Sequence, residues 1–346
     1  MSNFTNLQHY ILPSDLLITM LDAYKQIGMT KVYLESIESV TNVLEEKAQE
    51  EDCFYLSKIL ELDITEARKN LIISKNSNPR NYNEEVLYNI KNVLSVIKNE
   101  SKTYKLNASE LLSYMNQIFG KFKYNYTNKT INTVINKQIK KQSIRMMINE
   151  CFDEYDQQIA LKKYESIILS NILYFDIINL EPFNGRNDFA GLLSLYYLLL
   201  QNKIEIFKYV SFFKYIYQNY DKFIEASKTG SLNYSEGFVE SSNLSRLIFS
   251  IIIDAYIELS KENKKWTYKN NGFKSDNVES SIYKMPEFFS KEDVRRANPN
   301  VSDATINRIL NRMRDEQIIM PLGTGRSAKW RKNPDIDIPL SKLLGD

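Results

Sequence analysis

Apolar residues in this chain recur mostly at helical spacing. Residues 84–98 and 106–119 carry them three or four positions apart, which places them on one face of a helix. Residues 159–180 and 189–200 are apolar nearly all round, which is typical of helices at the centre of a bundle. The aromatic residues of these two segments are therefore interpreted as core. The pattern predicts a mainly α fold, arranged as a helical bundle.

One segment departs from this pattern. Residues 124–144 are rich in Asn, Thr and Lys, with β-branched residues between them. This composition favours a short β-hairpin. Its lysines Lys137, Lys140 and Lys141 are interpreted as a solvated rim, with nucleotide contact as the alternative.

The C-terminal part has a different composition. Residues 266–282 are rich in Asn, Ser and Lys and are interpreted as a linker. Ser290 can cap a first helix that ends at Ala297, and Ser302 or Asp303 can cap a second helix that ends at Asp315. Short strands at 318–322 and 328–330 would flank a glycine-containing wing. This order predicts a small winged helix-turn-helix.

The second of these helices and the wing carry clustered basic and amide side chains. A basic helix beside a basic wing is the charge layout of a protein that binds DNA in the major groove. The alternative is a winged helix used for protein contacts. One such unit per chain would normally require a homodimer for specific DNA binding. The candidate DNA contacts are Arg308, Asn311, Arg312, Arg326 and Lys329.

Composition limits the choice of compartment and partner. The 346 residues are 43% hydrophobic and 25% charged, which is ordinary for a globular protein of two or three domains. The 45 basic and 43 acidic residues give a net charge of +2, so no global attraction to nucleic acid or membrane is expected. Cys53 and Cys151 are isolated and lack metal-site spacing, so we expect no metal site and a reducing compartment. With no apolar run of ~18 residues and no leader pattern at the start, a cytoplasmic location without membrane contact is predicted.

Residues 179–193, NLEPFNGRNDFAGLL, form the most informative stretch of the sequence. They resemble the signature loop of the Fic (Fido) family, HPFx(D/E)GNGRxxRLL. Counted without gaps, Pro182 and Phe183 match, and Asn187 matches the central asparagine. Gly191 and the residues after it also follow in step. The resemblance implies a Fic-type helical bundle in which the 124–144 hairpin is the substrate-aligning flap.

The catalytic positions of this loop are replaced. In the family, a histidine is the general base, an acidic residue holds a metal, and two arginines bind the nucleotide phosphates. Here Glu181 stands at the histidine position, and Phe189 and Leu192 stand at the arginine positions. The only histidine, His9, lies in a polar N-terminal stretch. The remaining anion loop consists of Gly185, Arg186, Asn187 and Asp188. These replacements predict poor triphosphate binding.

A second alignment of the loop starts from Asn184-Gly185-Arg186, which reads NGR by itself. It requires a three-residue deletion, which would rotate the apolar face of the following helix. We therefore favour the ungapped alignment.

A segment near the N-terminus adds to the resemblance. Residues 36–46 are similar to the family's autoinhibitory segment, and Glu38 stands at its inhibitory glutamate. In the family that glutamate binds the second arginine of the loop, which is Leu192 here, so the pair cannot form. The alternative is that Glu38 is an ordinary solvated carboxylate. With further matches near residues 85–89, 120–123 and 209–223, the resemblance covers about 35–260.

The predicted organisation has four parts. An N-terminal helical region with the inhibitory-type helix (1–80) precedes a Fic-like domain (81–265), the linker (266–282), and a winged helix domain with a tail (283–346). Two functions are considered. The first is a Fic-like protein with a degenerate AMP-transferase motif, weakly active or inactive, that acts as a scaffold or regulator. The alternative is an active protein adenylyltransferase, or related phosphate-group transferase, that modifies a target protein with Glu181 as its base. No cofactor is assigned; ATP and Mg²⁺ are expected only if activity is retained.

Overall fold

The structure is a computed structural model of the 346-residue chain. It describes residues 4, 7, 10–36, 41–135, 138–299, 301–323 and 329–333, with the backbone alone described at 36, 133–135, 138–140, 262–277 and 280. The chain divides into two compact units, Met1–Ser260 and Lys261–Asp346. Within the described residues, no helix combines the length and apolar character needed to cross a membrane.

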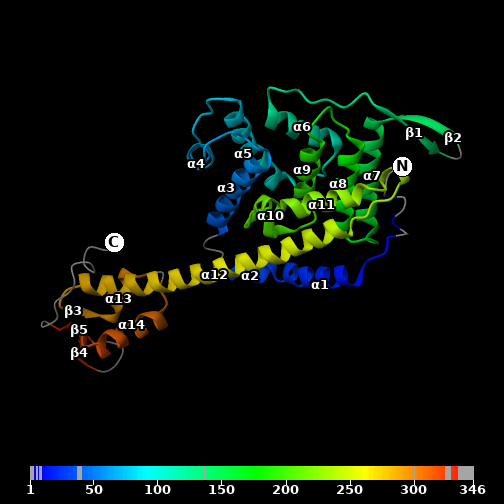
Figure 1. The fold of residues 1–346 in the computed structure, drawn as a ribbon. Helices are drawn as coiled ribbons and strands as arrows, with labels where there is room; N and C mark the ends of the chain where they lie inside the picture. The colour runs from blue at the N-terminus through cyan, green and yellow to red at the C-terminus, as the bar shows by residue number, and fades with distance from the viewer. Residues whose placement is uncertain are drawn as a thin grey trace. The chain divides into compact units, whose positions relative to one another are not determined.

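The first unit is mainly α-helical (Figure 1). Its elements in chain order are α1 (Ser14–Gly28), α2 (Thr30–Ser36), α3 (Thr41–Ile59), α4 (Glu66–Lys75), α5 (Tyr82–Glu100), α6 (Ala108–Phe119), β1 (Thr130–Ile135), β2 (Gln138–Ser143), α7 (Ile144–Leu161), α8 (Ser166–Leu180), α9 (Asn187–Gln201), η3 (Glu205–Lys208), α10 (Phe212–Gln218), α11 (Tyr220–Ser231), η4 (Tyr234–Glu236) and α12 (Ser242–Lys284), which continues into the second unit. The predicted helices at 84–98 and 106–119 are confirmed as α5 and α6.

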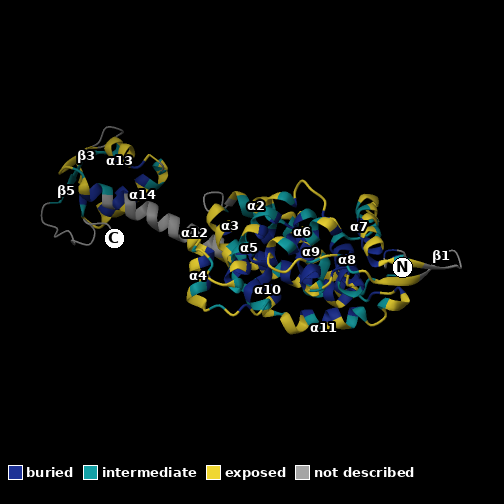
Figure 2. Ribbon diagram, turned by 90° about the horizontal axis from the view of Figure 1, so that it is seen from above, coloured by how far each residue is buried: buried dark blue, intermediate teal, exposed yellow. Residues whose placement is uncertain are grey.

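Helices α8 and α9 form the centre of this unit (Figure 2). Both are buried on nearly all sides, as their continuous apolar sequences predict. The expected single helix over 159–180 is wrong, however, because α7 ends at Leu161 and Lys162 adopts a left-handed conformation with φ 54°. Glu165 then starts α8, since its carboxylate accepts hydrogen bonds from the backbone N–H groups of Ile167 and Ile168 at 2.9 and 2.7 Å.

The predicted hairpin is present. Strands β1 and β2, which follow α6 in the chain, pair antiparallel from Thr130 opposite Ser143 to Ile135 opposite Gln138. Figure 1 shows them projecting from the helices beside α7. Lys141 is exposed, as expected for a solvated rim. Lys137 and the side chain of Lys140 lie outside the described residues.

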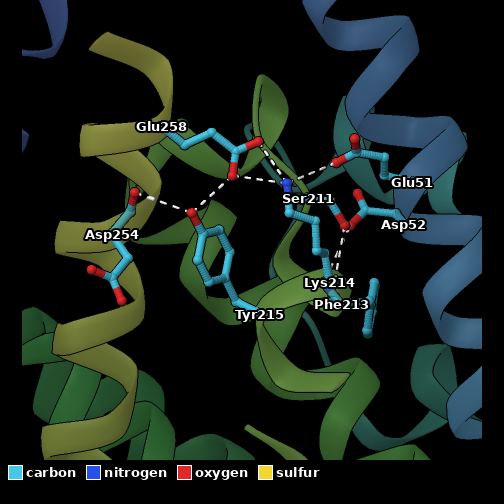
Figure 3. A network of polar contacts seen from close by, with 8 residues as sticks. All are labelled: Glu51, Asp52, Ser211, Phe213, Lys214, Tyr215, Asp254 and Glu258. Atoms are coloured by element: carbon cyan, nitrogen blue, oxygen red, sulfur yellow. Dashed lines mark hydrogen bonds and ion pairs between the residues drawn. The ribbon is translucent and has the colours of Figure 1, made fainter. Parts of the chain in front are cut away.

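A polar network joins α3, α10 and α12 within the first unit (Figure 3). The Lys214 ammonium forms ion pairs with Glu258 of α12 at 2.6 Å and with Glu51 of α3 at 3.3 Å. The Tyr215 hydroxyl donates to the same Glu258 carboxylate at 2.8 Å. All four side chains are at least partly buried, so these contacts are shielded from competing water.

Next to this network lies a fully buried carboxylate, Asp52. It accepts hydrogen bonds from the Ser211 hydroxyl at 2.7 Å and from the Phe213 backbone N–H at 3.3 Å, as Figure 3 shows. The Lys98 ammonium lies 3.2 Å from its other oxygen. Burial raises the pKa of Asp52, and the lysine and these hydrogen bonds oppose that shift. This cluster fixes α3 against α5 and the start of α10.

The second unit combines the end of α12 with a small sheet. Its other elements are β3 (Phe288–Ser290), α13 (Lys291–Ala297), α14 (Asp303–Asp315), β4 (Ile319–Pro321) and β5 (Lys329–Lys332), and its antiparallel strands have the order β3-β5-β4. Both predicted helices are confirmed, with Ser290 and Asp293 in a reciprocal capping box and Ser302 capping α14. Strand β3 was not predicted. The winged helix-turn-helix stays an interpretation of this arrangement.

The predicted linker is wrong, because residues 266–282 are helical and belong to α12. This segment contains no proline, and its end carries apolar residues at helical spacing. Val278, Ile282 and Tyr283 are buried in the core of the second unit, together with Phe289, Val294, Ile306, Ile309, Leu310, Met313 and Ile319. Burial of this face stabilises a helix that composition alone does not favour.

Candidate functional site

The loop that resembles the Fic signature connects the two central helices. Helix α8 ends at Leu180, and Glu181 adopts a left-handed conformation with φ 47° while its N–H still donates to the Ile177 carbonyl at 3.2 Å. Arg186 is also left-handed, with φ 52°, and precedes the first residue of α9, Asn187. A left-handed residue thus turns the chain sharply at each end of the six-residue connection 181–186.

Asn187 holds the connection in shape. Its side-chain oxygen accepts a hydrogen bond from the Phe183 N–H at 2.9 Å, and its amide nitrogen donates to the Phe183 carbonyl at 2.9 Å. The Phe183 side chain is buried, so these backbone groups have limited access to water. The match of Asn187 to the central asparagine of the signature therefore has a structural role in this chain.

Residues 125–127, just before the hairpin, are paired with the loop. The Thr127 N–H donates to the Pro182 carbonyl at 2.8 Å, and the Asn184 N–H donates to the Asn125 carbonyl at 3.1 Å. Between them, Tyr126 and Phe183 form an antiparallel bridge, and their rings lie 5.6 Å apart. The start of the hairpin is therefore fixed to the loop by backbone contacts.

The residues at the two arginine positions of the signature belong to the core. Phe189 and Leu192 are each 3% exposed. The Phe189 ring packs edge-on against Phe119 at 5.3 Å, and the Arg186 guanidinium lies over that same Phe119 ring, 4.6 Å from its centre. Neither side chain faces solvent, so neither is available to a ligand beside the loop.

An open hollow of about 460 Å³ lies beside the loop. The Glu181 carboxylate is paired with the Lys129 ammonium at 2.9 Å, and both side chains are more than half exposed. The hollow is lined by Thr127, Lys129, Ile178, Glu181, Phe183, Asn184, Gly185, Arg186, Asn187 and Asp188. Its two cationic and two anionic side chains balance in charge.

The carboxylates of Glu181 and Asp188 are the acidic groups of the lining. Within the described residues, no group of three or more His, Cys, Asp or Glu side chains could hold a metal ion. Gly185 supplies no ligand at the position that is acidic in the signature.

Solved structures resemble this chain in overall fold. A Fic family protein from Desulfovibrio desulfuricans G20 matches with a TM-score of 0.57 at 13% sequence identity, over 95% of this chain and 99% of that one. A Fic domain containing signaling protein from Bacteroides thetaiotaomicron VPI-5482 matches with a TM-score of 0.52 at 16% identity, over 71% of this chain and 97% of that one. The chain has the Fic fold. The sequence itself matches no protein-family model and no curated protein.

Other residues predicted from the Fic resemblance and the C-terminal pattern are placed as follows. Glu38 and Arg326 lie outside the described residues. Arg308 and Asn311 are exposed on α14, and Lys329 is exposed at the start of β5. The Arg312 guanidinium instead forms an ion pair with the largely buried Glu279 of α12 and a longer one, 3.7 Å, with Glu316. Arg312, one of the predicted DNA contacts, is thus already paired with carboxylates of the same chain.

Two residues of these sites were missed by sequence reasoning. Lys129 pairs with Glu181 although 52 positions separate them. Its place directly before the predicted hairpin, which the resemblance puts beside the loop, was the available signal. Glu279 was assigned to the linker, and recognising the helical spacing of Val278 and Ile282 would have placed it on α12.

Proposed function

We propose that this chain is a Fic-fold protein with a degenerate AMP-transferase motif that has weak or no transferase activity and acts as a scaffold or regulator. The observation that carries this proposal is the burial of Phe189 and Leu192. In the family these positions supply the arginines for the nucleotide phosphates. Here their side chains are part of the hydrophobic core, so the phosphate-binding function has been exchanged for packing.

The charge of the hollow supports the same proposal. Lys129 and Arg186 could attract a triphosphate, but Glu181 and Asp188 line the same space and repel it. Lys129 is already paired with Glu181, and Arg186 lies over the Phe119 ring. A nucleotide would have to compete with these internal partners.

Glu181 is the one candidate base in the loop. Its carboxylate lines the hollow, which is the observation that favours the active-transferase alternative. Proton removal alone does not position a nucleotide, however, and the partner of Glu181 is a lysine rather than a target hydroxyl. The scaffold function therefore accounts for more of the site.

Calorimetric titration with ATP and Mg²⁺, together with labelling of candidate target proteins by an ATP analogue, tests this proposal. We expect no binding in the low micromolar range and no labelling. The Arg186→Ala variant is the matched control for weak binding, because it removes one cation that lines the hollow. Magnesium-dependent micromolar binding that Arg186→Ala weakens, or labelling that Glu181→Ala abolishes, would support the transferase instead.

For the second unit we propose DNA as the partner through α14 and the wing. Arg308 and Asn311 lie on the solvent side of a helix whose opposite side is buried. Arginine and asparagine are suited to bidentate contacts with guanine and adenine. Because Arg312 is paired with Glu279, we expect it to contribute less than Arg308.

Mobility shifts at low salt with mixed-sequence duplexes test DNA binding. We expect Arg308→Ala to weaken binding and, for a phosphate contact, to flatten the salt dependence by about one unit of slope. Arg296→Ala removes an exposed charge from α13 in the same unit and is the control. Equal effects of the two variants, or no shift at micromolar protein, would favour protein contacts for this unit.

A further inference from the structure

Helices α1 and α2 expose a strip of large apolar side chains. On α1, Leu17, Leu21 and Tyr24 are spaced three and four residues apart and therefore lie along one side of the helix. Their exposed fractions are 40%, 59% and 39%. The strip, called here the α1 strip, consists of Leu17, Ile18, Leu21, Tyr24, Met29 and Val32.

The opposite side of α1 is anchored in the first unit. Leu16 and Ala23 are fully buried, and the Arg246 guanidinium of α12 pairs with Asp15 at 2.5 Å. At the edge of the strip, the Tyr24 ring lies 6.3 Å from Phe249, also of α12. Since these contacts already fix the helix, folding of this chain does not explain the apolar residues on its outer side.

The size of the strip matches a protein contact. A large apolar side chain that is about half exposed offers on the order of 100 Å², so six of them offer roughly 600 Å². This equals the largest patch of a typical monomer, and it supplies most of the ~800 Å² that each partner buries in a stable complex. A patch of this size is often functional.

The composition of the strip and its rim favours a second copy of this chain. An apolar helix side is complementary to itself when two copies meet about a twofold axis. Charges of both signs accompany the strip: Asp22 and Lys25 on α1, and Lys31 paired with Glu35 on α2 at 3.9 Å. A helix that binds lipid surfaces would instead carry several basic residues beside its apolar side, and Lys25 is the one basic residue of α1.

We propose that the α1 strip is the interface of a symmetric homodimer, with Leu21 close to the twofold axis. Leu21 lies at the middle of the α1 part of the strip, between Leu17 and Tyr24. The dimer does not depend on the function of the loop hollow or of the second unit, and its test has a separate readout.

Sedimentation velocity of the full chain over a range of concentrations tests the dimer. We expect the wild type to be dimeric at micromolar concentration and Leu21→Arg to raise the dimer dissociation constant at least tenfold. Leu232→Arg is the matched control, because Leu232 is 76% exposed but lies after α11, outside the strip. The control should dimerise as the wild type does. Circular dichroism and thermal unfolding verify that each variant is folded.

A disulfide provides a second test that does not depend on a disruptive variant. The two native cysteines, Cys53 and Cys151, are buried and therefore react slowly. The thiol introduced by Leu21→Cys is exposed and should be oxidised first. Mild oxidation should give a disulfide-linked dimer, whereas Leu232→Cys should remain monomeric on a denaturing gel. A wild-type protein that is still monomeric at about 100 μM would overturn the proposal. A dimer that neither Leu21→Arg nor Ile18→Arg weakens would also overturn it.

Discussion

Asn187 exchanges two hydrogen bonds with the backbone of Phe183, both at 2.9 Å. A side-chain amide can replace a backbone strand partner in this way because it carries a donor and an acceptor side by side. The loop between α8 and α9 therefore keeps its shape without a bound ligand.

Asn187→Ala should destabilise the first unit. It leaves the buried N–H and carbonyl of Phe183 without their partner, which costs about 1–3 kcal/mol of unfolding free energy. Denaturant unfolding followed by circular dichroism measures this loss. Asn184→Ala is the control in the same loop, since Asn184 is exposed and its side chain accepts one bond, from Asn125 at 3.1 Å. Equal losses for the two variants would contradict the structural role of Asn187.

Gly191 allows α9 to pack closely on α8. A methyl group at this position would lie 2.6 Å from Cγ2 of Ile178 and 3.1 Å from the Tyr174 ring. Gly191→Ala is therefore expected to cost about 1–3 kcal/mol, because both neighbours are on the central helix α8. Gly28→Ala places the same methyl in open space at the end of α1 and should be neutral or stabilising by up to about 1 kcal/mol. Thermal and chemical unfolding of the two variants compare these effects.

Glu84 should make stability depend on pH in the acid range. Its hydrogen bonds with Arg68 at 2.9 and 3.0 Å lower the pKa of the carboxyl group, and the Arg80 N–H adds to this effect. A lowered folded pKa contributes stability above the unfolded value of about 4.3, and this contribution is lost as the pH falls through the folded pKa.

Glu84→Gln should thus lower the unfolding free energy at pH 7 by about 2–4 kcal/mol, and the difference from wild type should shrink below about pH 4.3. Chemical unfolding at several pH values between about 3 and 7 measures how this difference in unfolding free energy changes. Glu66→Gln is the control, since Glu66 is 71% exposed and its ion pair with Lys58 should contribute less than about 1 kcal/mol. A difference for Glu84→Gln that does not vary with pH would exclude the carboxylate as its source.

The network around Lys214 should couple α10 to α12 energetically (Figure 3). A double-mutant cycle of Lys214→Met and Glu258→Gln isolates the pair, whose atoms are 2.6 Å apart. We expect a coupling free energy of about 1–3 kcal/mol, because both side chains are mostly buried. A coupling near zero would mean that Glu51 alone can hold Lys214 in place.

Helical periodicity and helix-capping residues were enough to predict much of the fold. The buried centres of α8 and α9 follow from continuous apolar sequence, and Ser290 and Ser302 mark helix starts that local chemistry decides. The break at 162–165 was missed because its cause, a carboxylate that caps the next helix, needs no glycine or proline. Residues 267–282 were misassigned because packing of Val278 and Ile282, which composition does not reveal, stabilises the helix.

The candidate site was less predictable than the fold. Sequence comparison with the signature located Glu181 and the replaced arginines, but the partner of Glu181 is Lys129, which the fold brings from a distant segment. Likewise, the ion pair between Arg312 and Glu279 depends on how α12 and α14 pack within the second unit. A basic residue in a helical pattern does not reveal whether an internal carboxylate already binds it.

Helix α8 has one end near the α1 strip and the other at the hollow. Tyr24 donates a hydrogen bond at 2.5 Å to Glu165, whose carboxylate caps the first turn, and the last turn ends at Leu180, directly before Glu181. With 15 residues at about 1.5 Å each, the two ends are roughly 22 Å apart. The amides of this one helix can thus serve as two spectroscopic reporters in a single isotope-labelled sample. Shifts at Ile167 and Ile168 would register self-association, whereas shifts at Glu181 would register a small molecule, so nuclear magnetic resonance could separate the two events without any mutation.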